Sequence, residues 1–265
     1  MNEERVRDFC LNVKKTLESF PVDEPQIIHL SETESTNQSL RSLSNFGLLP
    51  NKSILWTDYQ TKGRGQAGNS WESEFGKNLL CSILFYPEHL PANRSFGVLE
   101  IAALCVKSTL DKYTSSISIK WPNDIYWTNK KISGILIEND LTGDVVSRSI
   151  IGVGINLNQT EFISGAPNPV SLGLITGQLH DRREFLGQLQ AEFEWQVQEF
   201  HDKGIENLHQ RYSAALYRLD GFYCYQDANG CFEARIHAIE PSGTMILERK
   251  DGTLSGYTFK EVEYL

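Results

Sequence analysis

The stretch Thr61-Lys62-Gly63-Arg64-Gly65-Gln66-Ala67-Gly68-Asn69-Ser70-Trp71 says most about how this chain folds. Its glycines let the backbone turn N–H groups toward an anion, and its two cations supply the countercharge. The glycines also fit the spacing G-x-G-x-x-G, but a dinucleotide-binding fingerprint needs a helix that begins at the third glycine. Residues 69–78 show no helical apolar period, and the apolar run at residues 79–86 is typical of a strand. We therefore expect an anion-binding loop between two strands.

Two other nucleotide-binding loops do not fit this stretch. A protein-kinase glycine loop would be followed by V-A-I-K and H-R-D signatures, and neither is found in the sequence. A Walker A loop would end in G-K-S or G-K-T, which is also missing.

Length and composition narrow the class of protein. A chain of 265 residues is long enough for one large core and a small second domain. Its formal net charge of −9 argues against a nucleic-acid-binding protein, whose footprint is basic. The first ten residues lack the apolar core of a secretion signal, and the run at residues 79–86 is too short to cross a bilayer. We expect a cytoplasmic protein that binds neither nucleic acid nor a membrane.

Cysteine and histidine usage gives no sign of a disulfide framework or a metal centre. The five cysteines, at positions 10, 81, 105, 224 and 231, form no C-x-x-C pair. The six histidines lack spacings such as H-x-x-x-H. Reduced, mostly buried thiols and no structural metal are the expectation.

Apolar periodicity predicts a chain of mixed helices and strands. Helical spacing predicts helices over residues 6–17, 92–113, 181–204 and 205–216. A further helix is expected to be capped by Ser35-Thr36-Asn37 and to stop at Gly47. Strands are expected at 27–30, 54–59, 79–86, 117–121, 132–138 and 150–157.

The character of the sequence changes near residue 220. Short β-prone runs alternate there with turn signals at 228–230, 241–243 and 251–252. This spacing predicts a small all-β barrel of about 45 residues, with a domain boundary near 218–220.

Unusual residues are concentrated in four segments, at 35–37, 60–71, 120–134 and 152–156. By itself, Pro122-Asn123-Asp124 is typical of a turn between strands, and Lys131 of a solvated lysine at the start of a strand. Glycines inside the β-prone runs 132–137 and 152–155 indicate close approach by a ligand or another backbone. Each signal is weak alone, but the four occur in a distinctive order.

In that order, the sequence resembles the biotin protein ligases. The family's motifs appear here as GRGQAG at 63–68, KWPND at 120–124, KISGILIE at 131–138 and GVGIN at 152–156. The resemblance covers about residues 27–265. It implies an α+β fold in which a mixed-sheet catalytic domain, residues 27–218, is followed by a small SH3-like β-barrel, residues 219–265. Residues 1–26 would form a helical N-terminal extension.

The resemblance also implies a two-step ligase reaction. Biotin and ATP would form biotinyl-5′-AMP, and a lysine of a biotin carboxyl carrier protein would then take the biotinyl group. Lys131, Arg64 and Asp124 match the catalytic positions. Asp124 is the residue expected nearest the incoming carrier lysine, where it would help to orient that lysine or a magnesium ion. Mg²⁺ is expected with ATP, and no residue is assigned as its ligand. The carrier protein is not identified by the sequence, and both monomer and homodimer stay open.

The remaining positions are carried over from the same motifs. Biotin contacts are expected from Ser35, Thr36, Gln60, Gly63, Arg64, Lys131 and Gly134. Contacts with ATP or the adenylate are expected from Arg64, Gln66, Trp71, Asn123, Lys131, Gly154 and Asn156.

Two departures from the family pattern matter. Gln66 stands where the loop usually has a second arginine, so we expect a weaker hold on the adenylate. Residues 1–26 are too few for the DNA-binding domain of some members, so a ligase without repressor activity is expected.

Two alternatives to a biotin ligase stay open. A lipoate or octanoate ligase or transferase shares the fold, although its R-R-x-x-G-G-G-x-x-x-H-D loop is missing here. The other alternative is a biotin-binding protein with a degenerate site.

Overall fold

The structure is a computed structural model, and it describes residues 24–47, 49–163 and 168–265. The helix predicted over residues 6–17 lies outside the described residues, as does most of the predicted extension at residues 1–26.

The described chain divides into two compact units. The first unit holds residues up to 89, residues 134–163 and residues 171–182. The second unit holds residues 90–133, 168–170 and 183–265. The domain division predicted at residues 218 and 219 stays a prediction.

A mixed sheet forms the centre of the first unit. Its strands lie in the order β1 (Ile27–Thr33), β2 (Ile54–Gln60), β3 (Leu79–Phe85), β7 (Val145–Ile155) and β6 (Lys130–Thr142). The β1 and β2 strands are parallel, whereas β3 is antiparallel to both β2 and β7. The predicted mixed sheet is therefore confirmed.

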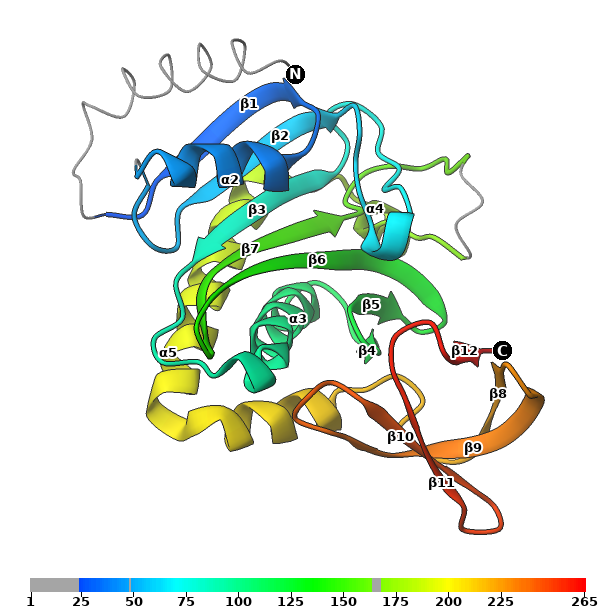
Figure 1. Ribbon diagram of the computed structural model, residues 1–265. Coiled ribbons are helices and arrows are strands. Elements are labelled where there is room, and N and C mark those ends of the chain that lie inside the picture. The colour runs from blue at the N-terminus through cyan, green and yellow to red at the C-terminus, as the bar shows by residue number, and fades with distance from the viewer. Residues whose placement is uncertain (1–23, 48, 164–167) are drawn as a thin grey trace. The chain divides into compact units, whose positions relative to one another are not determined.

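Helix α2 (Thr36–Asn45) covers one face of β2, β3 and β7 (Figure 1). Leu40 and Leu43 of this helix are fully buried against Leu55, Leu84 and Ile150. Burying each such side chain contributes about 1.5–3 kcal/mol, so this contact fixes α2 on the sheet. Just after the helix, the backbone at residue 47 adopts φ +66°, which explains the predicted glycine stop.

The second unit contains a hairpin of β4 (Ile117–Lys120) and β5 (Asp124–Trp127), followed by the first residues of β6. Helix α3 (Phe96–Asp111) packs against both hairpin strands, and the short 3₁₀ helix η2 (Ala92–Arg94) precedes it. Helix α5 (Arg182–Ala214) is interrupted at Gly204, whose φ of 78° is not helical. The predicted break between two helices at this glycine is confirmed.

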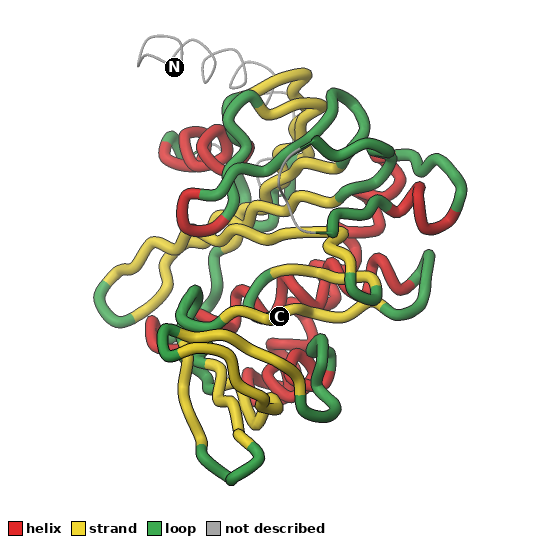
Figure 2. Tube along the Cα trace, turned by 90° about the vertical axis from the view of Figure 1, so that its right-hand side faces the viewer, coloured by secondary structure: helices red, strands yellow, loops and turns green. Residues whose placement is uncertain are grey.

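Five strands form an antiparallel sheet at the C-terminal end of the chain. They are β8 (Tyr223–Asp227), β9 (Gly230–Ile239), β10 (Met245–Arg249), β11 (Leu254–Tyr257) and β12 (Glu263–Tyr264), in the order β11-β10-β9-β8-β12. The turns between β8 and β11 fall where the turn signals predict them. In the trace of Figure 2, strands drawn in yellow alternate with green loops and turns. This sheet agrees with the predicted small SH3-like fold.

Several boundaries differ from the sequence-based expectation. Both β6 and β7 extend several residues toward their connecting turn, where polar side chains replace the apolar run that marks a strand in sequence. The β5 strand was not predicted, and neither was the helix α4 (Leu172–Thr176), whose five residues are too few to establish a helical period.

Two other expectations can be compared with the described residues. None of the helices in these residues is long and apolar enough to cross a membrane. Cys81 and Cys105 are buried, and burial raises the pKa of the Cys81 thiol to about 12. Cys224 and Cys231 are exposed, so the expectation of mostly buried thiols is wrong for these two.

Candidate functional site

The glycine-rich segment forms a loop between the antiparallel strands β2 and β3, as predicted. It folds back on itself, because the N–H of Gly65 donates to the carbonyl of Asn69 at 2.6 Å and the N–H of Trp71 donates to that of Gly63 at 3.0 Å. Its one helical element is the single 3₁₀ turn η1 (Gln66–Gly68). A dinucleotide-binding helix is therefore excluded in this loop.

Two glycines are required by this loop geometry. A Cβ at position 63 would lie 2.7 Å from the carbonyl oxygen of Trp71, so only glycine fits there. Gly68 has φ +89°, a region that strains residues with side chains.

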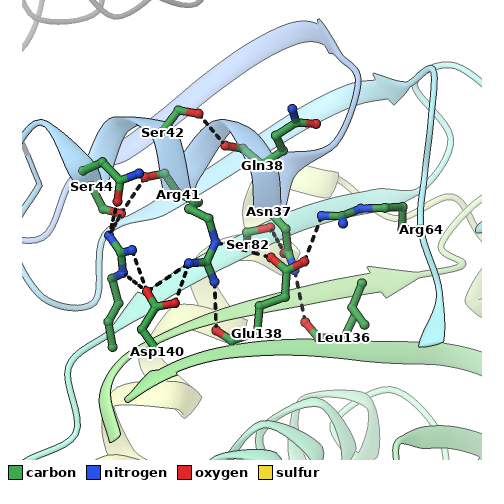
Figure 3. A network of polar contacts seen from close by, with 12 residues as sticks. Asn37, Gln38, Arg41, Ser42, Ser44, Arg64, Ser82, Leu136, Glu138 and Asp140 are labelled. Carbon is green, nitrogen blue, oxygen red and sulfur yellow. Dashed lines mark hydrogen bonds and ion pairs between the residues drawn. The ribbon is translucent and has the colours of Figure 1, made fainter. Parts of the chain in front are cut away.

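Arg64 of this loop pairs with a carboxylate on β6. Its Nη2 lies 3.0 Å from Oε1 of Glu138, and its side chain is 47% exposed (Figure 3). Glu138 is also 3.7 Å from the guanidinium of Arg41, which in turn binds Asp140 at 2.6 Å. Burial alone would raise the pKa of Asp140, but hydrogen bonds from Arg41 and Arg148 lower it. Arg64 is thus the exposed end of a chain of alternating charges.

The segment Ser35-Thr36-Asn37 lies at the start of α2 and is buried. Ser35 occupies the N-cap position, but its side chain makes no capping hydrogen bond, so that detail of the prediction is wrong. Instead, the N–H of Thr36 donates to Oε1 of Gln60 at 2.8 Å, and Thr36 Oγ1 lies 3.1 Å from the same oxygen. The amide oxygen of Gln60 therefore accepts one of the backbone N–H groups that have no partner within the first turn of the helix.

A second buried group lies beside Thr36. Ser82 on β3 places its Oγ 2.7 Å from Thr36 Oγ1 and 2.6 Å from Asn37 Oδ1. Nδ2 of Asn37 donates to the carbonyl of Leu136 on β6 at 3.3 Å. Sequence reasoning did not identify Ser82, although a serine inside the apolar run at residues 79–86 is a detectable signal.

The glycines of GVGIN make room for two predicted site residues. A Cβ at Gly152 would lie 2.4 Å from Oδ1 of Asn37, and one at Gly154 would lie 2.5 Å from the indole of Trp71. Trp71 therefore packs directly on the backbone of β7. Asn156, at the end of that strand, is buried, and its carbonyl accepts a hydrogen bond from the N–H of Leu172.

A groove of about 470 Å³ runs along this part of the first unit. The residues lining it include Tyr59, Gln60, Gly63, Trp71, Gln159 and Ile163. Nearby in the loop, Oε1 of Gln66 is buried and accepts no hydrogen bond from the described residues. An unsatisfied buried acceptor is costly, so this position suits a ligand that donates a hydrogen bond.

In the second unit, Lys131 pairs with Asp124. Nζ of Lys131 lies 2.7 Å from Oδ1 of Asp124, and both side chains are about three-quarters buried. The backbone of Lys131 is fixed by hydrogen bonds with the carbonyl of Asn168 and the N–H of Val170, both at 2.9 Å. Two residues that were predicted to be catalytic are therefore in direct contact.

The turn of KWPND connects β4 to β5, and the peptide bond between Trp121 and Pro122 is cis. Nε1 of Trp121 donates to the carbonyl of Gly243 at 2.9 Å, and the hydroxyl of Tyr212 donates to that of Pro122 at 2.7 Å. Asn123 in the same turn is buried. Contacts from α5 and the C-terminal sheet therefore hold this turn in place.

Lys120, the first residue of that motif, was not singled out from the sequence. Its Nζ lies 3.2 Å from the hydroxyl of Tyr126 and 5.0 Å from the ring centres of Tyr126 and Tyr264. Burial lowers the pKa of Lys120. This lysine therefore lies against two aromatic rings, one on β5 and one on β12.

The predicted site residues thus form two sets, one in each unit. The first unit holds Ser35, Thr36, Gln60, Gly63, Arg64, Gln66, Trp71, Gly134, Gly154 and Asn156. The second unit holds Asn123, Asp124 and Lys131. Strand β6 passes through both, with Lys131 three positions before Gly134. No cluster of three His, Cys, Asp or Glu side chains that could hold a metal ion occurs in the described part of the chain.

Comparison with known proteins relates this arrangement to a group of ligases. The model of the biotin/lipoate A/B protein ligase family matches residues 30–156. The chain is 26% identical to the bifunctional ligase/repressor BirA of Bacillus subtilis, covering 88% of this chain and 72% of that protein. It is 29% identical to the biotin–[acetyl-CoA-carboxylase] ligase of Paracoccus denitrificans, covering 84% and 94% respectively.

Solved structures give the same relationship. The biotin protein ligase of Aquifex aeolicus in complex with biotin and ATP is similar with a TM-score of 0.73 and 26% identity. That match covers 91% of this chain and 99% of the Aquifex chain. The likeness therefore includes both the mixed sheet and the C-terminal strands.

Proposed function

We propose that this chain is a biotin protein ligase of the biotin/lipoate A/B protein ligase family. It activates biotin with ATP as biotinyl-5′-AMP and transfers the biotinyl group to a lysine of a biotin carboxyl carrier protein. The observation that carries this proposal is the placement of the four motif segments on a fold similar to that of a ligase solved with biotin and ATP. These segments supply the exposed side chain of Arg64 and the ion pair of Lys131 with Asp124. They also supply the buried polar side chains of Thr36 and Asn37.

In the first step, a biotin carboxylate oxygen attacks the α-phosphorus of ATP, and the bond to pyrophosphate breaks. Negative charge collects on the phosphate oxygens, so cations positioned in advance lower the barrier. Arg64 can make two parallel hydrogen bonds to such oxygens. Lys131 contributes its ammonium group once it exchanges Asp124 for the substrate.

In the second step, the amine of the carrier lysine attacks the acyl carbon of the adenylate, and AMP leaves. The amine must lose a proton to become nucleophilic. When Lys131 moves to the phosphate, the carboxylate of Asp124 becomes available to orient this amine and accept its proton. The pair at 2.7 Å thus supplies one residue to each step.

Magnesium fits this site as a companion of ATP. The motifs offer two carboxylates, of which Glu138 is paired with Arg64 and Asp124 with Lys131. Mg²⁺ in such sites is held largely by phosphates and water, with one or two carboxylates, and it neutralises phosphate charge. Asp124 is the residue that would hold it.

The other partners stay predictions. A biotin carboxyl carrier protein is the expected acceptor, and its identity is open. We also predict that the chain binds no nucleic acid and acts in the cytoplasm. A homodimer stays an open question. The ligase reaction depends on none of these points.

Biotin-dependent exchange of labelled pyrophosphate into ATP tests the proposed reaction. We expect exchange with biotin and none with lipoate. Lys131→Ala should lose most of the exchange, whereas Lys130→Ala, which removes the neighbouring exposed lysine, should retain it. Exchange with lipoate alone would favour the lipoate-ligase alternative. Biotin binding without any exchange would indicate a degenerate binding protein.

A further inference from the structure

Gln159 is a buried glutamine that the proposed reaction does not use. It lies in the loop after β7, and only 2% of the residue is exposed. Its Oε1 accepts from the N–H of Glu74 at 3.0 Å and from Nδ2 of Asn78 at 2.6 Å. Its Nε2 donates to the carbonyl of Glu161 at 2.8 Å and to Oε1 of Glu72 at 3.3 Å. A carboxamide has two donors and an oxygen with two lone pairs, so this side chain makes all four of the hydrogen bonds that it can make.

Backbone groups fix the orientation of this amide. The N–H of Glu74 can only donate and the carbonyl of Glu161 can only accept, so Oε1 must face the first and Nε2 the second. The fully buried amide of Asn78 is fixed in the same way, because its Oδ1 accepts from the N–H of Leu157 at 3.1 Å. Nδ2 of Asn78 therefore faces Gln159. The two amides can adopt only one hydrogen-bonding arrangement.

These contacts join two segments that lie outside the helices and strands. One is residues 72–78, which lead from the glycine-rich loop into β3, and the other is residues 156–163, which follow β7. The N–H of Asn158 also donates to the carbonyl of Lys77 at 3.0 Å. Gln159 is hydrogen-bonded to three residues of the first segment, so it is the main tie between the two.

Trp71 lies immediately before the first of these segments. Its indole packs on the bare backbone of Gly154, five residues before Gln159. Apolar packing is non-directional, so the hydrogen bonds of the neighbouring residues decide where the indole lies. On the C-terminal side of Trp71 the chain is held at Glu72 and Glu74, and both are hydrogen-bonded to Gln159.

We propose that Gln159 is a positioning residue that holds Trp71 in place for stacking on the adenine of ATP. This inference rests on the proposed function, since Trp71 is expected to contact ATP. An indole stacks on a nucleobase through its flat face, so its position affects the affinity. Gln159 touches no substrate in this account and acts through residues 72–74. The residues assigned to biotin lie in other segments, so Gln159 influences the affinity for ATP and not that for biotin.

Gln159→Glu tests the proposal, because it keeps the shape of the side chain and removes both of its donors. The new carboxylate would face that of Glu72 across 3.3 Å, and like charges at this distance repel. The KM for ATP in biotin-dependent pyrophosphate exchange should therefore rise at least about tenfold. The exchange rate at saturating ATP should stay near the wild-type value. The dissociation constant for biotin, measured by calorimetry on the full-length protein, should stay unchanged.

Glu72→Gln combined with Gln159→Glu is the rescue variant. In this double variant the carboxamide and the carboxylate exchange places, so the hydrogen bond between them forms in the opposite direction. The like-charge repulsion is also removed. The KM for ATP should recover most of the loss, a result that a general defect in folding would not give.

Gln196→Glu is the matched control in the second unit. Gln196 is also a fully buried glutamine, and its Nε2 donates to a carboxylate, that of Glu192, at 3.0 Å. This variant should lose stability without a change in the KM for ATP. If Gln159→Glu does not fold, Gln159→Met removes the same hydrogen bonds without adding a charge and should raise the KM for ATP as well.

Three results overturn the inference. The first is an unchanged KM for ATP in a folded Gln159 variant. The second is an equal rise in the dissociation constant for biotin, and the third is a rise in KM that the double variant leaves in full. Failure of the proposed function is separate, since wild-type protein would then show no biotin-dependent exchange.

Discussion

The ion pair between Arg64 and Glu138 leads to a quantitative prediction. Arg64 is expected to grip the anionic groups of the substrates, yet in this structure its Nη2 lies 3.0 Å from Glu138. A substrate must therefore compete with a carboxylate for the same guanidinium. Glu138→Gln removes the competing charge and keeps the shape of the side chain.

The size of the expected change in substrate affinity follows from the solvent exposure of Arg64 and Glu138. The two side chains are 47% and 26% exposed, so solvent screens the pair. An exposed ion pair of this kind is worth at most about 1 kcal/mol, which corresponds to about a fivefold change in an equilibrium constant. The dissociation constant for biotin and the KM for ATP should therefore fall by about two- to fivefold in Glu138→Gln.

Asp140→Asn is the matched control for this experiment. Asp140 binds Arg41 and Arg148 in the same network but does not contact Arg64. Its variant should lose stability without a change in substrate affinity. Weaker substrate binding in Glu138→Gln would refute the reasoning, because it would show that Glu138 prepares Arg64 for the substrate. Unchanged binding would show that the pair does not compete at all.

Three further predictions concern the loop, the adenine face and acid stability. Gln66→Arg should slow dissociation of biotinyl-5′-AMP by adding a charged contact, and equal dissociation rates in rapid-dilution measurements would contradict this. Gly154→Ala should raise the KM for ATP at least about tenfold, because its Cβ would lie 2.5 Å from the Trp71 indole and displace it; Gly187→Ala, where no atom lies within 4 Å, should not. The lowered pKa of Asp140 contributes stability that is present above the ordinary value of 3.8 and is lost as pH falls through the lowered pKa. Unfolding by denaturant should therefore show a shallower acid loss of stability for Asp140→Asn than for wild type, and parallel curves would contradict it.

Local patterns in the sequence predicted those parts of the structure that local forces determine. The glycine-rich loop, the stop at Gly47 and the break at Gly204 follow from backbone conformations that favour glycine. The strands at 54–60 and 79–85 follow from their apolar runs. The predicted site residues lie within short motifs, so neighbouring members of one motif stay together in the structure, and both their membership of a site and their roles stay predictions.

Contacts between distant segments could not be predicted in this way. Glu138 was quoted within its motif, but its pairing with Arg64 depends on how β6 lies beside the loop. Ser82 was hidden in an apolar run, and its hydrogen bond to Thr36 depends on the approach of α2 to β3. The contact of Trp121 with Gly243 joins residues that are 122 positions apart. In each case the geometry of the sheet, and not the local sequence, brings the partners together.

Mass spectrometry of a biotin carboxyl carrier domain tests the central claim most directly. The carrier domain is incubated with this protein, biotin and ATP, and its intact mass and tryptic peptides are measured. The account predicts one biotinyl group on a single lysine, formed only when ATP is present, and little product with Lys131→Ala. An unmodified carrier domain, or one that is modified equally well by Lys131→Ala, would contradict it.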